Sequence, residues 1–213
     1  MKTVLCYGDS ITWGSDAKTG GRHAFEDRWP NVLQKALGPE VQVIADGLRG
    51  RTTGYDEHLA ACDRNGVRIL PTSLYTHAPL DLVILLLGAN DMKPAIAGTA
   101  LAAMQGMRRL VEIVRLNATR DGTSEPPAIL IVAPPPLSET ANAEFAAMFS
   151  GGVEQSRMVA SLYADLADET GCGFFDAASV AETTPIDGVH LDAENTRAIG
   201  KALEPIVRMM LGL

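Results

Sequence analysis

Cysteine is scarce in this sequence of 213 residues, and the three that occur, Cys6, Cys62 and Cys172, are widely separated. None belongs to a Cys-x-x-Cys pair, so the sequence indicates neither a disulfide framework nor a zinc site. Isolated cysteines are typical of small buried or half-buried side chains in a reducing compartment. We therefore expect a cytoplasmic location and no bound metal ion.

Basic clusters and long apolar runs are missing as well. The chain has 18 Lys and Arg against 26 Asp and Glu, and its only adjacent basic pair is Arg108-Arg109. Proteins that bind nucleic acid or anionic membranes concentrate basic residues, so we expect neither partner. A neutral or cationic small molecule suits the net charge of -8 better. No apolar run approaches the roughly 18 residues that span a bilayer, and the first run, of about five residues, is too short for a signal peptide.

Short apolar runs do occur, and amphipathic segments separate them. The runs 82–87 and 129–132 are continuous rather than alternating, which is typical of central strands buried on both faces. This alternation of strand and helix predicts a three-layer α/β/α fold with a five-stranded, mostly parallel sheet in flavodoxin-like order. The length suits one domain over residues 1–213. Strands are expected at 3–7, 41–45, 80–87, 128–133 and 173–175, and helices at 29–37, 100–117, 153–170 and 193–211.

Two connections look long, 15–27 and 134–152. Loops of that length in a compact domain are usually binding loops or lids. The second contains Phe145, Met148 and Phe149 among small residues, a set able to form an exposed apolar patch through which copies of the chain associate. The alternative is that both phenylalanines are buried in their own subunit.

Polar residues follow the expected strands. In parallel sheets the functional crevice lies beyond the carboxyl ends of the strands. A Gly-Asp-Ser tripeptide at 8–10 follows the first strand, a glycine-containing loop at 46–53 follows the second, and Asn90 follows the third. Asp187 and His190 stand three residues apart, shortly before the last helix. We therefore expect these groups to meet at one edge of the sheet.

These are the components of a serine acyl hydrolase, although Gly-Asp-Ser by itself is ordinary turn and helix-cap chemistry. A serine hydroxyl is a poor nucleophile until an imidazole accepts its proton. A carboxylate on the other ring nitrogen fixes the imidazole tautomer. One turn can direct both Asp187 and His190 toward Ser10. The presence of this pair favours Ser10 as a nucleophile.

Neighbouring residues have simpler interpretations. Asp9 and Asp91 are expected to brace the loops by hydrogen bonding to backbone. His23 and His58 are interpreted as loop or surface residues, and His77 as a helix-end residue, because none has an acidic partner at the spacing of the Asp187 pair.

Two positions keep two interpretations each. Asn90 either caps the helix after the third strand or directs a side-chain N–H at a tetrahedral oxyanion. Gly50 is either a turn glycine or the place where a substrate carbonyl approaches a backbone N–H closely.

The four motifs together resemble the sequence blocks of the SGNH (GDSL-type) hydrolase family over nearly the whole chain. Further stretches at 8–14, 51–53, 79–83 and 134–136 resemble its bacterial arylesterase/acyltransferase branch. Ile11 stands where leucine is more usual in the family, a change that does not touch the chemistry. The blocks themselves read Gly8-Asp9-Ser10, Gly50, Gly88-x-Asn90-Asp91 and Asp187-x-x-His190.

The resemblance implies a role for each block. It makes Ser10 the nucleophile, His190 the base and Asp187 the partner of that base. It also implies an oxyanion hole formed by the backbone N–H groups of Ser10 and Gly50 and by the side-chain amide of Asn90. We expect no cofactor. Members of this branch tend to form closed oligomers, so a homo-oligomer is expected as well.

Position and resemblance also suggest residues that line the substrate pocket. Substrate specificity resides in loops, and no sequence motif identifies the loop residues that provide it. The candidate substrate-binding residues are Ile11, Trp13, Ala89, Phe145, Phe149 and Val189.

The favoured function is hydrolysis of small neutral esters, with short acyl or aryl groups, through an acyl-serine intermediate, with acyl transfer to alcohols as an added possibility. The same site suits acetylated carbohydrates, thioesters or lysophospholipids. A nucleotide- or flavin-binding module of flavodoxin type is the alternative from another class, but the sequence has no Gly-x-Gly-x-x-Gly or Gly-Lys-Ser/Thr phosphate cradle. A non-catalytic carbohydrate-binding relative is disfavoured because every chemical position is filled.

Overall fold

The strands form one parallel sheet in the order β2-β1-β3-β4-β5 in the computed structural model, which describes residues 1–118 and 125–213. This is the fold class and strand order that the sequence predicts. All five residues of β3 are buried, as its continuous apolar run requires, whereas the edge strand β5 is half-buried. The strands are β1 (Lys2–Gly8), β2 (Val41–Gly47), β3 (Leu82–Leu86), β4 (Ala128–Ala133) and β5 (Gly173–Asp176).

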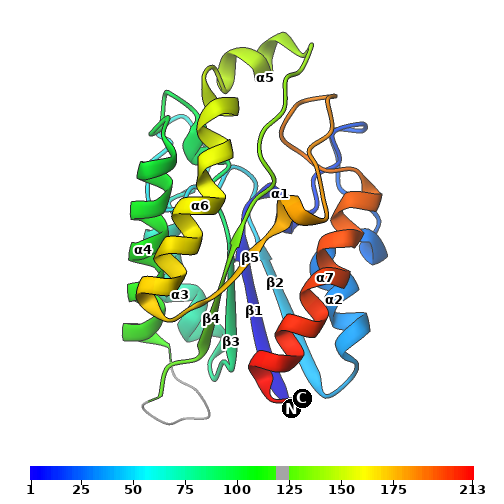
Figure 1. Ribbon diagram of the computed structural model, residues 1–213, viewed down its shortest axis with the longest axis vertical. Helices are drawn as coiled ribbons and strands as arrows, with labels where there is room; N and C mark the ends of the chain where they lie inside the picture. The colour runs from blue at the N-terminus through cyan, green and yellow to red at the C-terminus, as the bar shows by residue number, and fades with distance from the viewer. Residues whose placement is uncertain (119–124) are drawn as a thin grey trace.

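Helices cover both faces of the sheet (Figure 1). Side chains alternate between the faces along β1, so that Leu5 and Tyr7 pack into one core and Val4 and Cys6 into the other. The first core lies under α3 (Gly66–His77), α4 (Ala100–Asn117) and α6 (Gly152–Thr170), and the second under α2 (Trp29–Leu37) and α7 (Ala193–Leu211).

Three of the four expected helices have the bounds that the sequence predicts, and α6 begins one residue earlier than expected. Helix α3 was not among the helices with predicted bounds, because Gly66 at its start and Pro71 inside it are poor helix formers, but its end at His77 confirms that residue as a helix end. The Asn65 side chain caps α3 by accepting the N–H of Arg68. The apolar pattern of residues 100–117 predicts Leu101 on the buried face of α4, but Leu101 is exposed.

Three smaller expectations need correction. Residues 134–152 are not a continuous loop, since they include the short helix α5 (Ala143–Met148), which the Asn142 side chain caps. His23 lies in a loop, as predicted, but it is buried rather than at the surface, and its Nε2 lies 3.0 Å from the carbonyl oxygen of Leu191. Cys62 is exposed, whereas Cys6 is buried and Cys172 half-buried.

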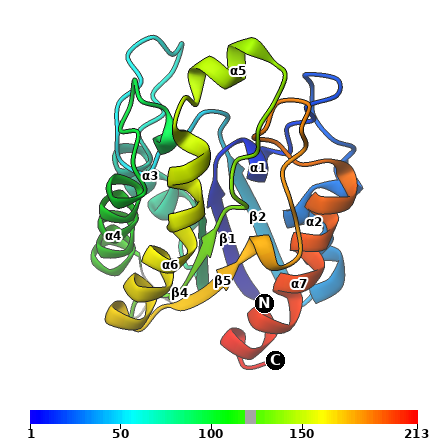
Figure 2. The same cartoon turned by 45° about the horizontal axis from the view of Figure 1, so that its top comes forward.

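The carboxyl ends of the strands form the edge at which polar loops gather. Figure 2 tilts this edge toward the viewer and shows α5 above the end of the sheet at which the one-turn helix α1 (Ser10–Trp13) lies. Among the described residues, no helix is both long and apolar enough to cross a membrane.

Candidate active site

Ser10 stands at the start of α1, directly beyond the carboxyl end of β1. The turn between them is tight, because a Cβ at Gly8 would lie 2.0 Å from Oγ1 of Thr12. Asp9 caps the turn, since its Oδ1 accepts the N–H of Ile11 at 2.9 Å. The tight turn and the Asp9 cap therefore hold Ser10 at the end of the sheet.

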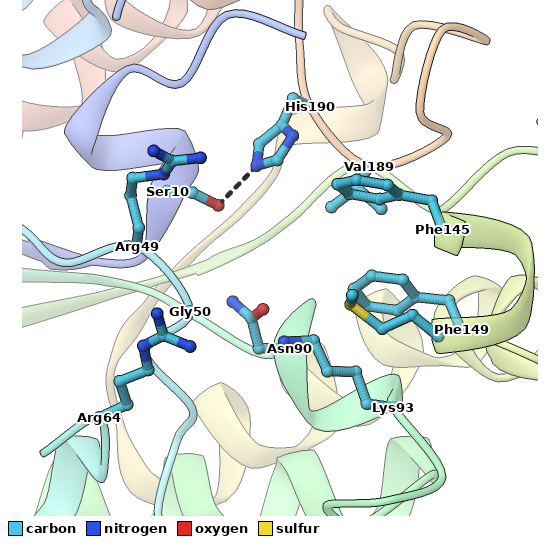
Figure 3. A pocket seen from close by; sticks show the side chains of 11 residues that line it. Ser10, Arg49, Gly50, Arg64, Asn90, Lys93, Phe145, Phe149, Val189 and His190 are labelled. Carbon is cyan, nitrogen blue, oxygen red and sulfur yellow. Dashed lines mark hydrogen bonds between the residues drawn. The ribbon is translucent and has the colours of Figure 1, made fainter. Parts of the chain in front are cut away.

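His190 reaches Ser10 from the loop before α7. Its Nε2 lies 3.0 Å from Oγ of Ser10, and its Nδ1 lies 2.6 Å from Oδ2 of Asp187 (Figure 3). The other carboxylate oxygen of Asp187 accepts the backbone N–H groups of Val189 and His190, each at 2.9 Å. Burial raises the pKa of Asp187, but these hydrogen bonds outweigh it and hold the pKa below its usual range. The structure thus aligns hydroxyl, imidazole and carboxylate in one hydrogen-bonded row.

Gly50 lies in the loop after β2 with a φ of +80°, a conformation that glycine adopts without strain. The buried guanidinium of Arg51 fixes this loop. It donates to the carbonyl oxygens of Gly8 at 2.9 Å and Asp46 at 2.7 Å, and to the Asp46 carboxylate at 2.9 Å. The position of Gly50 is therefore tied to the end of β1, from which Ser10 follows.

Asn90 follows β3 and turns its side chain into the same crevice. Its Nδ2 lies 3.2 Å from the carbonyl oxygen of Arg51 and 3.5 Å from Oδ2 of Asp9. The residue in the cap position of this 3-10 turn is Ala89, and Thr99 caps α4. The interpretation of Asn90 as a helix cap is therefore wrong, and its amide N–H group is directed by neighbouring oxygens.

Two buried carboxyl groups lie behind these loops. Asp9 caps α1, and Asp91 accepts hydrogen bonds from the backbone N–H and the hydroxyl of Thr53. This confirms the bracing role predicted for both. Burial raises the pKa of Asp9 to about 6 and that of Asp91 to about 7; the hydrogen bonds from Thr53 lower the latter in part, and the charge of Asp9 raises it.

A cavity of about 370 Å³ opens over Ser10 and His190. Gly50 and Asn90 line it as well, so the structure brings all the residues of the predicted oxyanion hole and two members of the predicted triad to one space. Its other walls are cationic or apolar, and they are Arg49, Arg64, Lys93, Phe145, Met148, Phe149 and Val189.

Three predicted wall residues, Phe145, Phe149 and Val189, line this cavity, and three do not. Ile11 packs into the core under α2 and α7, because α1 turns its side chain inward. Ala89 is buried outside the cavity lining.

Trp13, the third residue outside the lining, lies next to it instead. Its ring is covered by the guanidinium groups of Arg22, at 4.7 Å from the centroid, and Arg49, at 5.2 Å. The prediction from position failed for Ile11 and Trp13 because successive residues of a helical turn point about 100° apart.

The aromatic rings of the α5 segment face the cavity rather than solvent. The centroids of Phe145 and Phe149 are 6.3 Å apart, and Phe145 meets His190 edge-on at 6.1 Å. Phe149 is buried and Phe145 half-buried, so only Met148, 37% exposed, remains of the expected apolar surface patch. The alternative of phenylalanines covered within their own subunit describes the structure better.

Sequence reasoning missed the cationic wall. Arg49 was recognisable as the neighbour of Gly50, but Arg64 and Lys93 come from other loops and carried no motif. Within the described ranges, no group of three or more His, Cys, Asp or Glu side chains is arranged to hold a metal ion.

Comparison with known proteins gives a consistent result. Residues 6–197 match the model of the GDSL-like Lipase/Acylhydrolase family. The structure superimposes on that of a carbohydrate acetylesterase family member from Sinorhizobium meliloti with a TM-score of 0.98 and 70% identity, over 100% of both chains. An aryl esterase from M. smegmatis gives a TM-score of 0.92 and 41% identity, over 99% of this chain and 100% of the other. No curated protein sequence matches the chain.

Proposed function

Because the chain belongs to the GDSL-like lipase/acylhydrolase family and is a carboxylic ester hydrolase, we propose that Ser10, His190 and Asp187 carry out its reaction. The observation that supports this most directly is the hydrogen-bonded row from Oγ of Ser10 through His190 to Asp187, with distances of 3.0 and 2.6 Å. An imidazole placed in this way can accept the serine proton as the hydroxyl attacks an ester carbonyl.

The proposed reaction has two stages. Oγ of Ser10 bonds to the ester carbonyl carbon while Nε2 of His190 takes its proton, and the carbonyl oxygen becomes an oxyanion. The backbone N–H groups of Ser10 and Gly50 and the Asn90 amide stabilise that oxygen. His190 then protonates the departing alcohol, which leaves an acyl-Ser10. Water, deprotonated by His190, releases the acid and restores the serine.

For substrate, we propose short acyl esters of aromatic alcohols or sugars. Two close relatives in structure bear the names carbohydrate acetylesterase and aryl esterase. Phe145, Phe149 and Val189 offer an apolar wall for an aryl or acyl group. An alcohol in place of water at the second stage would accept the acyl group, so acyl transfer belongs to the same proposal.

Two further proposals rest on the sequence. The cytoplasmic location follows from the cysteine pattern, and the homo-oligomer follows from the family branch that the motifs resemble. Light scattering tests the second: a stable monomer of about 22.6 kDa at working concentration contradicts it.

Replacement of the nucleophile tests the central proposal. We expect Ser10→Ala to lower kcat for 4-nitrophenyl acetate by at least about 10³-fold, since loss of a triad nucleophile costs several orders of magnitude. Ser15→Ala is the matched control, because Ser15 is equally buried and its hydroxyl has no hydrogen-bond partner among the described residues. Both variants should melt within a few degrees of wild type. A Ser10→Ala enzyme with more than about a hundredth of the wild-type kcat contradicts the assignment.

A further inference from the structure

The charge of the cavity is opposite to the charge of the protein. The chain carries a formal net charge of -8, yet three cationic side chains, Arg49, Arg64 and Lys93, line the cavity, and no carboxylate does. An acidic protein that concentrates cations over its reactive serine creates a local field that attracts anions.

Arg49 is the less engaged of the two arginines. It is exposed and adjoins Gly50, and its guanidinium carbon lies over the face of Trp13, 5.2 Å from the ring centroid. Among the described residues it has no ion-pair partner within 4 Å. A guanidinium held against an aromatic face keeps its N–H groups available for a ligand.

Arg64 also lies against the loop that contains Gly50. A Cβ at Gly50 would lie 2.8 Å from three atoms of the Arg64 guanidinium group, so this group rests directly on the glycine. Its Nη1 pairs with Glu57 at 2.6 Å, and its Nε is buried without a hydrogen-bond partner in the part of the chain that the structure describes. Lys93 shares the same carboxylate at 3.4 Å. One carboxylate thus serves two cations, which leaves this group with positive charge.

The other acidic groups near the site are already engaged. Asp187 accepts hydrogen bonds from His190 and two backbone N–H groups. Asp9 and Asp91 are buried behind the loops and bond to backbone. None of the three lies in the cavity lining between the arginines and Ser10.

The cavity is also two-sided. Figure 3 shows Arg49 and Arg64 with Gly50 and Ser10 on one side, and Phe145 and Phe149 on the opposite side, with the hydroxyl of Ser10 turned toward His190. An ester carbonyl held at Ser10 therefore presents one substituent toward the guanidinium groups and the other toward the rings.

We propose that the enzyme prefers esters that carry a carboxylate a few bonds from the scissile bond, and that Arg49 and Arg64 bind that carboxylate. This rests on the proposed function, because it places the ester carbonyl at Ser10. The planar guanidinium fork of Arg49 matches a carboxylate with two parallel hydrogen bonds, and Arg64, whose Nη1 is paired with Glu57, adds positive charge beside it. Neutral esters remain substrates, and the carboxylate raises kcat/KM.

The test compares 4-acetoxybenzoate with its neutral methyl ester. The measured quantity is the ratio of kcat/KM for the anionic ester to kcat/KM for the neutral ester. The intrinsic reactivity of each ester is the same for every variant, so it cancels when the ratios of two variants are compared. We expect this anionic-to-neutral ratio to fall by about threefold or more in Arg49→Gln and in Arg64→Gln, and by about tenfold or more in the double variant. Arg109→Gln removes the same charge from an exposed site on α4 and leaves the ratio unchanged.

Two further measurements separate local charge from local structure. Glu57→Gln removes the carboxylate that two cations share, so the ratio should rise by about twofold or more, a direction that damage to the loop would not produce. In wild type, raising the salt from about 0.05 to 0.5 M should lower the ratio, since mobile ions screen the attraction, and the double variant should respond less.

The outcomes are distinct. A ratio that stays the same in the double variant and in Glu57→Gln, while the neutral ester is still hydrolysed, overturns the anion preference and leaves the proposed function intact. Failure of wild type to hydrolyse either ester through Ser10 overturns both. Arg49→Lys keeps the charge but loses the fork, and an intermediate ratio is expected. A ratio as low as that of Arg49→Gln in a well-folded Arg49→Lys protein argues that the planar fork rather than the charge binds the carboxylate.

Discussion

The floor and the rim of the cavity are built differently. The floor consists of the strand-end residues Ser10 and Asn90, backed by Asp91, and all three are nearly or fully buried and hydrogen-bonded to neighbouring loops. The rim consists of α5, which contains no buried residue, and of the exposed Arg49. Groups that must meet a transition state are fixed by many contacts, whereas groups that meet the rest of the substrate are held by few. Substitutions in the floor should therefore change mainly kcat, whereas substitutions in the rim should change mainly substrate binding.

The largest effect is expected at the floor, in Asp187→Asn. The imidazole of His190 loses the carboxylate that fixes its tautomer, and the comparable loss in another serine hydrolase is about 10⁴-fold in kcat. Asp192→Asn is the matched control, because Asp192 caps α7 two residues beyond His190 and an asparagine keeps the cap. If Asp187→Asn lost less than about tenfold in kcat, the row through His190 would not be the catalytic one.

Asn90 gives the next largest effect. Because its amide is needed mainly when charge has moved onto the carbonyl oxygen, Asn90→Ala should lower kcat by about 10²–10³-fold with little change in KM. Asn90→Asp places a negative charge against the oxyanion and should be at least as inactive. Kinetics at saturating ester and thermal melts on the same preparations provide the measurement. An active Asn90→Asp enzyme would exclude the oxyanion role.

At the rim, Phe145→Ala should raise KM for aryl esters by a few-fold and change kcat less, because the ring offers binding surface rather than charge stabilisation. Its melting temperature should change little, since the ring is only half-buried on α5. Leu85→Ala in β3 is the opposite case: a fully buried leucine costs about 2–5 kcal/mol of stability on truncation. A Phe145→Ala enzyme with a lower kcat and an unchanged KM would show that this ring acts in the transition state, as the floor residues are expected to do.

The smallest effect concerns stability against pH. The pKa of Asp91 is raised to about 7 in the fold, from an ordinary value of 3.8. Between these values the folded protein holds a proton that the unfolded chain has released, so this group favours folding at low pH and loses that contribution as pH rises through 7. Asp91→Asn removes the titration. Its melting temperature relative to wild type should increase by about 2 °C or more between pH 5 and pH 8, and a decrease over that range contradicts the assignment.

The floor could be predicted from the sequence because its residues occur just after apolar runs that can only be central strands. The continuous run before Asn90 predicts a strand that ends at Leu87, one residue beyond the observed end of β3 at Leu86, and this places Asn90 at the carboxyl edge of the sheet. The rim could not be predicted in the same way. Arg64 and Lys93 reach the cavity from loops whose paths depend on ion pairs with Glu57. Ile11 lies next to Ser10 in the sequence, but α1 directs its side chain into the core.

The proposed nucleophile and base come from distant parts of the chain, since Ser10 and His190 are 180 positions apart. During synthesis the serine leaves the ribosome long before its base exists, and domains fold as units once their sequence is complete. Through all that time the serine is an ordinary alcohol with no imidazole to accept its proton. The contact between His23 and Leu191 joins the same two regions a second time. If Ser10 and His190 act as proposed, the nascent chain is inactive and hydrolytic activity is expected only once the sheet has formed.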